Sequence, residues 1–123
     1  MDDRPIGIFD SGLGGLTALK ALHALLPGED LVFFADTGRM PYGSRPFWQL
    51  RAFARQNLDF LASFGVKAVL AACGTLSSTA ADLLDANPVP ACGVLRPSLA
   101  AMAAVPGDDA LAVIATGASI RRP

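Results

Sequence analysis

The sequence predicts an α/β fold in which a parallel β-sheet is flanked by helices. Three observations support this prediction. Short apolar runs alternate with stretches whose apolar residues recur at helical spacing. Prolines and glycines mark the ends of those stretches. Polar loops follow the apolar runs, and alternation of strand and helix along a whole chain is typical of parallel sheets with helices on both faces.

The expected elements follow from these patterns in order. Leucines at positions 16, 19, 22 and 26 form one stripe of a helix that begins near Leu16 and ends before Pro27. A second helix begins near Pro46, and Gly65 suits the cap beyond its end. Its inward face is expected to hold Phe47, Leu50, Phe53, Ala54, Leu58 and Leu61. Further helices are expected at 77–86 and 97–104, and strands at 6–9, 31–35, 66–72, 89–94 and 111–115.

Composition limits the class of protein. The chain has 123 residues, of which 52% are apolar and 17% charged, so we expect one small domain with a hydrophobic core. A net charge of −1 gives no reason to expect nucleic acid or a membrane surface as a partner. Two cysteines and one histidine do not have the spacing of a metal site. We therefore expect a cytoplasmic protein with no metal and no membrane segment.

Cys73 is the first candidate for chemistry. It ends the apolar run of the expected third strand and is followed by Gly74 and Thr75, before the next helical pattern begins. The carboxyl end of a parallel strand is the usual place for a site. A helix start is expected to lower the pKa of a thiol there, because its N–H groups favour the thiolate. The alternative is a small buried apolar cysteine without a chemical role.

Three loops are expected to meet at that edge of the sheet. They contain Asp10 and Ser11, the stretch 36–44, and residues 73–75. The Asp10 carboxylate suits an ammonium group, whereas hydroxyl and N–H donors suit a carboxylate, so the site fits a free amino acid. Because His23 is far in sequence from these loops, the thiol is better suited to proton transfer than to nucleophilic attack.

A nucleotide is the competing ligand. Gly12 and Gly14 partly match a dinucleotide-binding loop, although Thr17 stands where that motif has glycine or alanine. Asp36 follows the second strand, as the ribose-binding acid does in such proteins. The charge of Asp10 at the mouth of the glycine loop would repel a pyrophosphate, which makes nucleotide binding the weaker hypothesis.

Three stretches also carry a resemblance to a known family. Residues 6–17, 34–43 and 72–75, together with 94–97 and 113–116, resemble glutamate racemases of the aspartate/glutamate racemase family. The resemblance is in register over essentially the whole chain. It implies a cofactor-independent racemase that interconverts L- and D-glutamate, with the D-isomer used for peptidoglycan and hence for cell wall and cell shape.

The resemblance also implies roles for particular residues. The family uses two cysteines on opposite faces of the substrate α-carbon, and Cys73 matches the first, assisted by Asp10. The matching substrate-binding positions are Asp10, Ser11, Tyr42, Gly43, Gly74 and Thr75. Gly74 departs from the family pattern, which has asparagine there, and so removes one expected hydrogen bond to the substrate.

The second departure concerns the other cysteine. In the family it lies in a Cys-Thr-His motif of the later of two similar α/β halves. We expect 1–105 to form the amino-terminal half, and 106–123 to be the first strand and start of an incomplete second domain. Cys92 is a poor substitute, since it lies inside an expected strand and is expected to point into a helix layer.

We therefore expect the 123-residue chain to be a truncated racemase that is inactive or weakly active alone. Glutamate is the expected small-molecule partner, and a homodimer or another chain is expected to supply the missing half. Three alternatives stay open. They are a non-catalytic half-domain that binds an amino acid or a partner chain, a nucleotide-binding α/β domain, and a racemase for another acidic amino acid.

Overall fold

The computed structural model describes residues 2–107 and 110–121. Four strands form one parallel sheet in the order β2-β1-β3-β4. Their bounds are β1 Ile6–Asp10, β2 Leu31–Ala35, β3 Ala68–Ala71 and β4 Ala91–Gly93. The predicted fold class is confirmed, and the first two strands lie within one residue of their expected bounds. The third and fourth strands are shorter than expected at both ends.

The strand register brings three strand ends to one level. Ala35 of β2 pairs with Asp10 of β1, and Ala71 of β3 pairs with Phe9. Beyond the pairs, the Ala72 N–H donates to the Phe9 carbonyl at 2.9 Å. The loops that follow β1, β2 and β3 therefore leave the sheet side by side, as parallel pairing requires.

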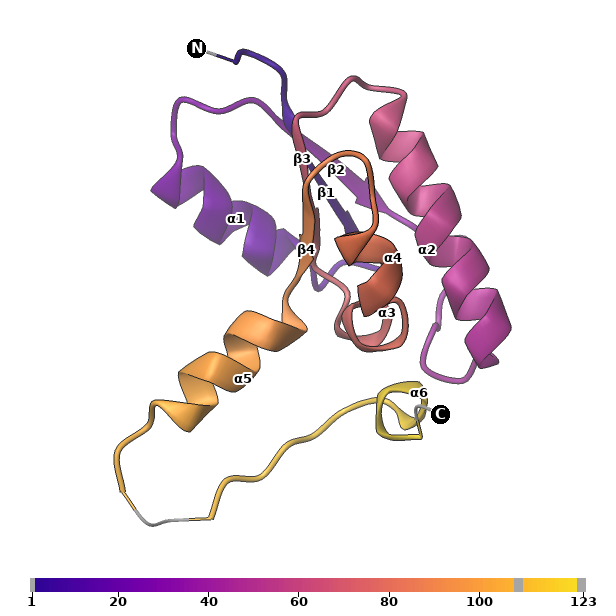
Figure 1. Cartoon of the computed structure of the whole chain (residues 1–123), viewed down its shortest axis with the longest axis vertical. Coiled ribbons are helices and arrows are strands. Elements are labelled where there is room, and N and C mark those ends of the chain that lie inside the picture. The colour runs from indigo at the N-terminus through magenta and orange to yellow at the C-terminus, as the bar shows by residue number, and fades with distance from the viewer. Residues whose placement is uncertain (1, 108–109, 122–123) are drawn as a thin grey trace.

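Helices cover both faces of the sheet. In Figure 1, α1 and α2 lie on opposite sides of the strands, while α5 extends away from the body of the fold. In the described residues the helices are α1 Leu16–Leu25, α2 Phe47–Ala62, α3 Gly74–Thr79, α4 Ala81–Asp85, α5 Leu95–Ala103 and α6 Gly117–Ile120. Within this part of the chain, no helix has the length and apolar character needed to span a bilayer.

The hydrophobic core lies mainly between the sheet and α2. Every residue predicted for the inward face of this helix is buried except Phe47, which is half-buried. Gly65 follows the helix with a φ of +67°, the left-handed conformation that glycine adopts most readily. Sequence periodicity therefore identified the side of α2 that the sheet covers.

The other helix is packed more loosely. The predicted stripe of α1 is only partly covered, because Leu19 and Leu22 are half-buried whereas Leu16 and Leu26 are exposed. No residue of α1 is fully buried. This helix therefore covers its face of the sheet without contributing fully buried side chains to the core.

The expected helix at 77–86 is instead two short helices. The break falls at Ala80, whose φ of −134° lies outside the helical region. The hydroxyls of Ser78 and Thr79 both donate to the Thr75 carbonyl, at 2.9 and 2.8 Å. Such side-chain bonds compete with regular helical hydrogen bonds, which accounts for the interruption.

The prediction of a strand at 111–115 is wrong. Residues 110–116 have no regular secondary structure, and the chain runs past α5 before it turns into α6 beside α3 (Figure 1). A strand needs a hydrogen-bonded neighbour, and no segment within 2–107 pairs with these residues. The apolar composition therefore identified a β-prone segment but not its partner.

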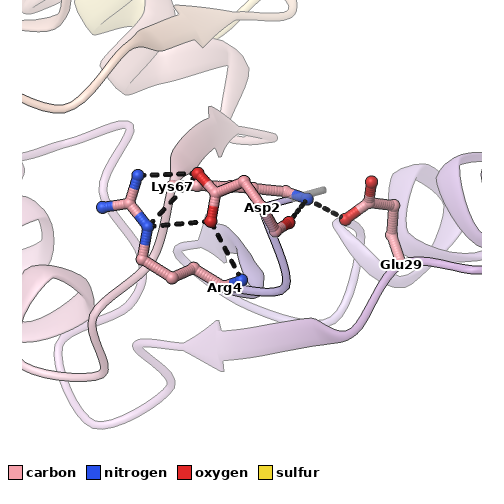
Figure 2. A network of polar contacts seen from close by, with 4 residues as sticks. All are labelled: Asp2, Arg4, Glu29 and Lys67. Carbon is pink, nitrogen blue, oxygen red and sulfur yellow. Dashed lines mark hydrogen bonds and ion pairs between the residues drawn. The ribbon is translucent and has the colours of Figure 1, made fainter.

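Charged side chains connect the segments that enter the sheet, at the amino-terminal ends of its strands. As Figure 2 shows, the Lys67 ammonium lies between the Glu29 carboxylate and the Asp2 carbonyl, the latter at 2.6 Å. Arg4 pairs with the Asp2 carboxylate at 2.7 Å. These contacts join the residues that precede β1, β2 and β3, far from the loops at the carboxyl edge.

The position of the core predicts the cost of one substitution at two sites. Leu61 in α2 is 0% exposed and Leu25 in α1 is 76% exposed. Leu61→Ala should lower the free energy of unfolding by about 2–5 kcal/mol, because it leaves a cavity. The control Leu25→Ala should change it by about 0.5 kcal/mol or less. Urea denaturation measures both, and equal losses would show that the core has been misplaced.

Candidate active site

A cavity of about 400 Å³ opens at the carboxyl edge of the sheet. The residues expected at the site that line it come from the end of β1, the loop after it and the start of α3, and they are Asp10, Ser11, Cys73, Gly74 and Thr75. The structure therefore brings together five of the seven residues expected at the site. A volume of this size falls within the usual range for small-molecule sites.

Much of the rest of the cavity wall is apolar, and the sequence did not predict this part of the wall. One side is the inward face of α5, with Leu99 and Met102, and another is the extended segment that carries Val113 and Ile114. The apolar run at 111–115 was visible in the sequence but was interpreted as a strand. Residues 113–115 instead line the same cavity as Asp10 and Cys73.

Asp10 is held firmly at the end of β1. Its residue is 7% exposed, and its Oδ2 accepts the Gly15 backbone N–H at 2.8 Å. A Cβ on Gly15 would come within 2.6 Å of the Asp10 Cβ, so this close approach requires glycine. The carboxylate therefore accepts a hydrogen bond from a backbone N–H just before α1, which fixes its position beside the cavity.

Cys73 lies between β3 and α3 in an extended conformation. The residue is 3% exposed, yet it lines the cavity together with Asp10. Burial raises the pKa of the Cys73 thiol, and the nearby Asp10 charge raises it further. The Leu76 N–H and the Ser11 hydroxyl lower this pKa without outweighing burial. The expected lowering of the pKa is therefore wrong, because desolvation dominates the effect of the helix start.

Hydroxyl groups join the start of α3 to the carboxyl-terminal segment. The Thr75 and Thr116 hydroxyls are 3.0 Å apart, and the Ser78 and Ser119 hydroxyls are 2.9 Å apart. Thr116 also caps α6 by accepting the Ser119 N–H. These bonds place Thr116 and Ser119 at the cavity rim, where the sequence alone gave no reason to expect them.

Tyr42 and Gly43, the other two expected site residues, do not line this cavity. The Tyr42 side chain is buried in the core, where its hydroxyl donates to the Asp36 carboxylate. The Gly43 carbonyl accepts the Ala118 N–H at 3.2 Å, and a Cβ on Gly43 would lie 2.9 Å from that of Thr116. In this arrangement both residues support the walls of the site.

A buried polar network holds the long loop that contains Tyr42. Asn57, on the inward face of α2, donates to the Tyr42 hydroxyl at 3.3 Å and accepts from Arg39 at 2.9 Å. Arg39 also pairs with Asp36 at 2.6 Å. Burial and the hydrogen bond to Asp36 raise the pKa of Tyr42 well above its usual range, so the phenol stays protonated. In the sequence, the one indication of this network is Asn57, a polar residue among the apolar positions of α2.

The remaining candidates lie elsewhere. Cys92 is exposed on β4 and lines a separate cavity of about 130 Å³ beside α4 and α5, away from the cavity that contains Cys73. β4 is a three-residue edge strand, which leaves the thiol accessible. His23 is exposed on α1. Among residues 2–107 and 110–121, no three histidine, cysteine or acidic side chains gather as metal ligands do.

Comparisons with known proteins place this arrangement in a family. No protein-family model matches the chain. Glutamate racemase from Pediococcus pentosaceus is 42% identical over 122 residues, which are 98% of this chain and 46% of that protein. Glutamate racemase from Thermus thermophilus is 52% identical over 95 residues, or 76% of this chain and 37% of that protein.

Solved structures agree. The crystal structure of Thermus thermophilus glutamate racemase in complex with β-chloro-D-alanine has a TM-score of 0.88 and 44% identity, covering 96% of this chain and 45% of its own. The Francisella tularensis enzyme in complex with D-glutamate has a TM-score of 0.87 and 39% identity, covering 98% of this chain and 45% of its own. The chain spans about half the length of the curated relatives it matches. It belongs to the glutamate racemase family and corresponds to the amino-terminal half of its members.

Proposed function

We propose that this chain provides one half of a glutamate racemase site, in which Cys73 transfers the α-proton of glutamate without a cofactor. The convergence of Asp10, Ser11, Cys73, Gly74 and Thr75 on one cavity is the observation that carries this proposal. The known relatives include a structure with D-glutamate bound, which supports an acidic amino acid as the ligand.

The charges and donors of the cavity suit such a ligand. Asp10 offers a fixed carboxylate for the substrate ammonium, since one of its oxygens is held by Gly15. Hydroxyls of Ser11 and Thr75, with the free N–H groups at the start of α3, are donors for a carboxylate. The same family relationship leaves another acidic amino acid as an alternative substrate.

The chemical step is a proton transfer at the α-carbon. The Cys73 thiolate takes the α-proton, so that the C–H bond breaks, an S–H bond forms, and the electron pair stays on the substrate carbon. Racemisation then requires a proton from the opposite face. Cys92 does not line the cavity, so we propose that the second acid comes from another chain or from a further half of the protein. The isolated chain is then inactive or weakly active in racemisation.

The wider role follows from the family. A racemase of this kind supplies D-glutamate for peptidoglycan, and hence for cell wall and cell shape, which fits an enzyme that works in the cytoplasm. We propose glutamate as its small-molecule partner, together with a homodimer mate or another chain that completes the site.

Two other functions are weaker. A dinucleotide needs N–H groups at the start of α1, but the Gly15 N–H is bonded to Asp10. It also needs a free acid after β2, whereas Asp36 is buried against Arg39 and Tyr42. A non-catalytic half-domain that binds an amino acid or a partner would have this same cavity. It would differ from half of an enzyme in that it does not exchange the α-proton of glutamate.

Proton exchange tests the proposal directly. In D₂O, the chain should exchange the α-proton of one glutamate enantiomer faster than that of the other, measured by proton NMR, with little racemisation. Cys73→Ala should reduce exchange to the uncatalysed rate because it removes the base. Cys92→Ala is the control and should keep the parental rate. Equal exchange in Cys73→Ala, no exchange in the parent, or racemisation at an ordinary enzyme rate of about 10 s⁻¹ would contradict the proposal.

The same assay has an expected pH dependence. Because burial raises the pKa of Cys73, the thiol stays protonated up to a higher pH than an ordinary cysteine of about 8.5. The active thiolate fraction therefore grows as pH rises, and exchange should still be increasing above pH 8.5. A plateau near neutral pH would show that the thiolate forms more readily than the burial of Cys73 allows.

We expect that replacing Gly74 with asparagine increases the affinity for glutamate. A Cβ at this position meets no heavy atom within 4 Å, and the residue lines the cavity. Gly74→Asn should therefore fit and add an amide hydrogen bond, tightening glutamate binding about 5- to 150-fold for one satisfied buried partner. Calorimetric titration measures the change.

The matched control for this substitution is Gly38→Asn. Gly38 is equally open, but it lies on the exposed loop after β2 and away from the cavity. Glutamate affinity should be unchanged in this variant. An unchanged affinity in Gly74→Asn, or an equal gain in Gly38→Asn, would count against glutamate binding beside Gly74.

A further inference from the structure

A second cavity lies on the other side of α6 from the proposed active site. It has a volume of about 170 Å³ and lies between the loop before α2 and the segment that forms α6. Thr116, the cap of α6, faces the first cavity, whereas Gly117 and Ala118 line the second. This second cavity is separate from the Cys73 site and has no role in the proton transfer described above.

The charge in this cavity is of one sign. Two guanidinium groups, Arg45 and Arg121, line it, and none of the described lining residues is acidic. The carboxylates of nearby elements already have partners, since Asp36 pairs with Arg39 and Asp82 pairs with Arg51 at 2.6 Å. No carboxylate within residues 2–107 or 110–121 forms an ion pair with either of the two lining arginines. Two guanidiniums that share a cavity, with neither paired to a carboxylate in the described part of the chain, favour an anion between them.

A hydrogen-bond donor of Arg45 without an acceptor also favours an anion at this cavity. The Arg45 Nε is buried and has no hydrogen-bond acceptor in the described part of the chain. The Nη2 of the same side chain donates to the Arg39 carbonyl at 3.1 Å, which holds the guanidinium in place. Leaving a buried charged donor without an acceptor is unfavourable, so this guanidinium favours an anionic acceptor beside it.

The size and donors of the cavity select the class of anion. Its volume equals that of about five or six water molecules at roughly 30 Å³ each, which is sufficient for one oxyanion group. Two guanidinium groups and the Ser44 hydroxyl offer more donors than the two oxygens of a carboxylate can use. A phosphate group has enough oxygens to accept from all three residues, and arginine forks suit it geometrically.

We propose that this cavity binds a phosphate group through Arg45 and Arg121, either as the free ion or as the phosphate of a larger ligand that extends into solvent. The binding would also hold α6 against the loop before α2, next to the Gly43 carbonyl that accepts the Ala118 N–H. This proposal does not depend on the racemase function, because it concerns binding at a different cavity.

Calorimetric titration with inorganic phosphate at constant ionic strength tests the proposal on the full chain. We expect saturable binding at one site, weakened at least tenfold by Arg45→Gln and by Arg121→Gln. The control Arg55→Gln removes the same charge from an exposed position on α2 that lines neither cavity. Its affinity for phosphate should stay within twofold of the parent.

Glycerol 3-phosphate forms the second arm of the experiment. Tighter binding than inorganic phosphate identifies a phosphorylated metabolite as the ligand, and equal or weaker binding identifies the free ion. Thermal denaturation checks that each variant folds. If Arg45→Gln unfolds, Arg121→Gln decides, since Arg121 is exposed. No saturable binding, or an equal loss in Arg55→Gln, would overturn the proposal.

Discussion

The register between β1 and β3 is the constraint on which the candidate site depends. Phe9 pairs with Ala71, and the Ala72 N–H continues the ladder to the Phe9 carbonyl. This pairing brings Asp10 and Cys73 out of the sheet at the same level, from neighbouring strands. A slip of one residue would turn alternate side chains to the opposite face and separate the carboxylate from the thiol. The shared cavity is therefore a consequence of backbone pairing, to which the Asp10–Gly15 hydrogen bond adds a fixed orientation.

Buried polar groups provide the second layer of support. Asn57 on α2, with Asp36 and Arg39, holds the loop that contains Tyr42 against the core. The same loop contacts α6, because the Gly43 carbonyl accepts a hydrogen bond from the Ala118 N–H. Each of these polar groups has a partner, as buried groups require, so the loop is defined by hydrogen bonds in addition to apolar packing. The cavity wall thus rests on residues that do not themselves line it.

The sequence predicted the elements whose signals are local. The apolar face of α2 and the alternation of strands and helices needed only periodicity, and the meeting of Asp10 with Cys73 followed from parallel topology. Other features depend on distant partners. The segment at 111–115 has the composition of a strand but lacks a neighbour to pair with, and the phenol of Tyr42 is buried by contacts that no local pattern reveals. The family resemblance implied substrate-binding roles for Tyr42 and Gly43, but it did not indicate how exposed either residue is.

The thiol illustrates why a local rule failed. A helix start does favour thiolate, and the Leu76 N–H acts in that direction. Desolvation acts in the opposite direction and is the larger effect on the pKa of Cys73, because the residue is almost completely buried. Burial depends on the packing of the whole edge of the sheet, so motif spacing could not reveal it.

Backbone amide NMR during a glutamate titration tests most directly whether the strand ends form one ligand site. The account predicts that the amides of Ser11, Gly74 and Thr75 shift most and saturate together with a single dissociation constant, because all three line the same cavity. Shifts confined to residues away from this edge, such as Lys20 and His23 on α1, or the absence of any saturable shift, would contradict it.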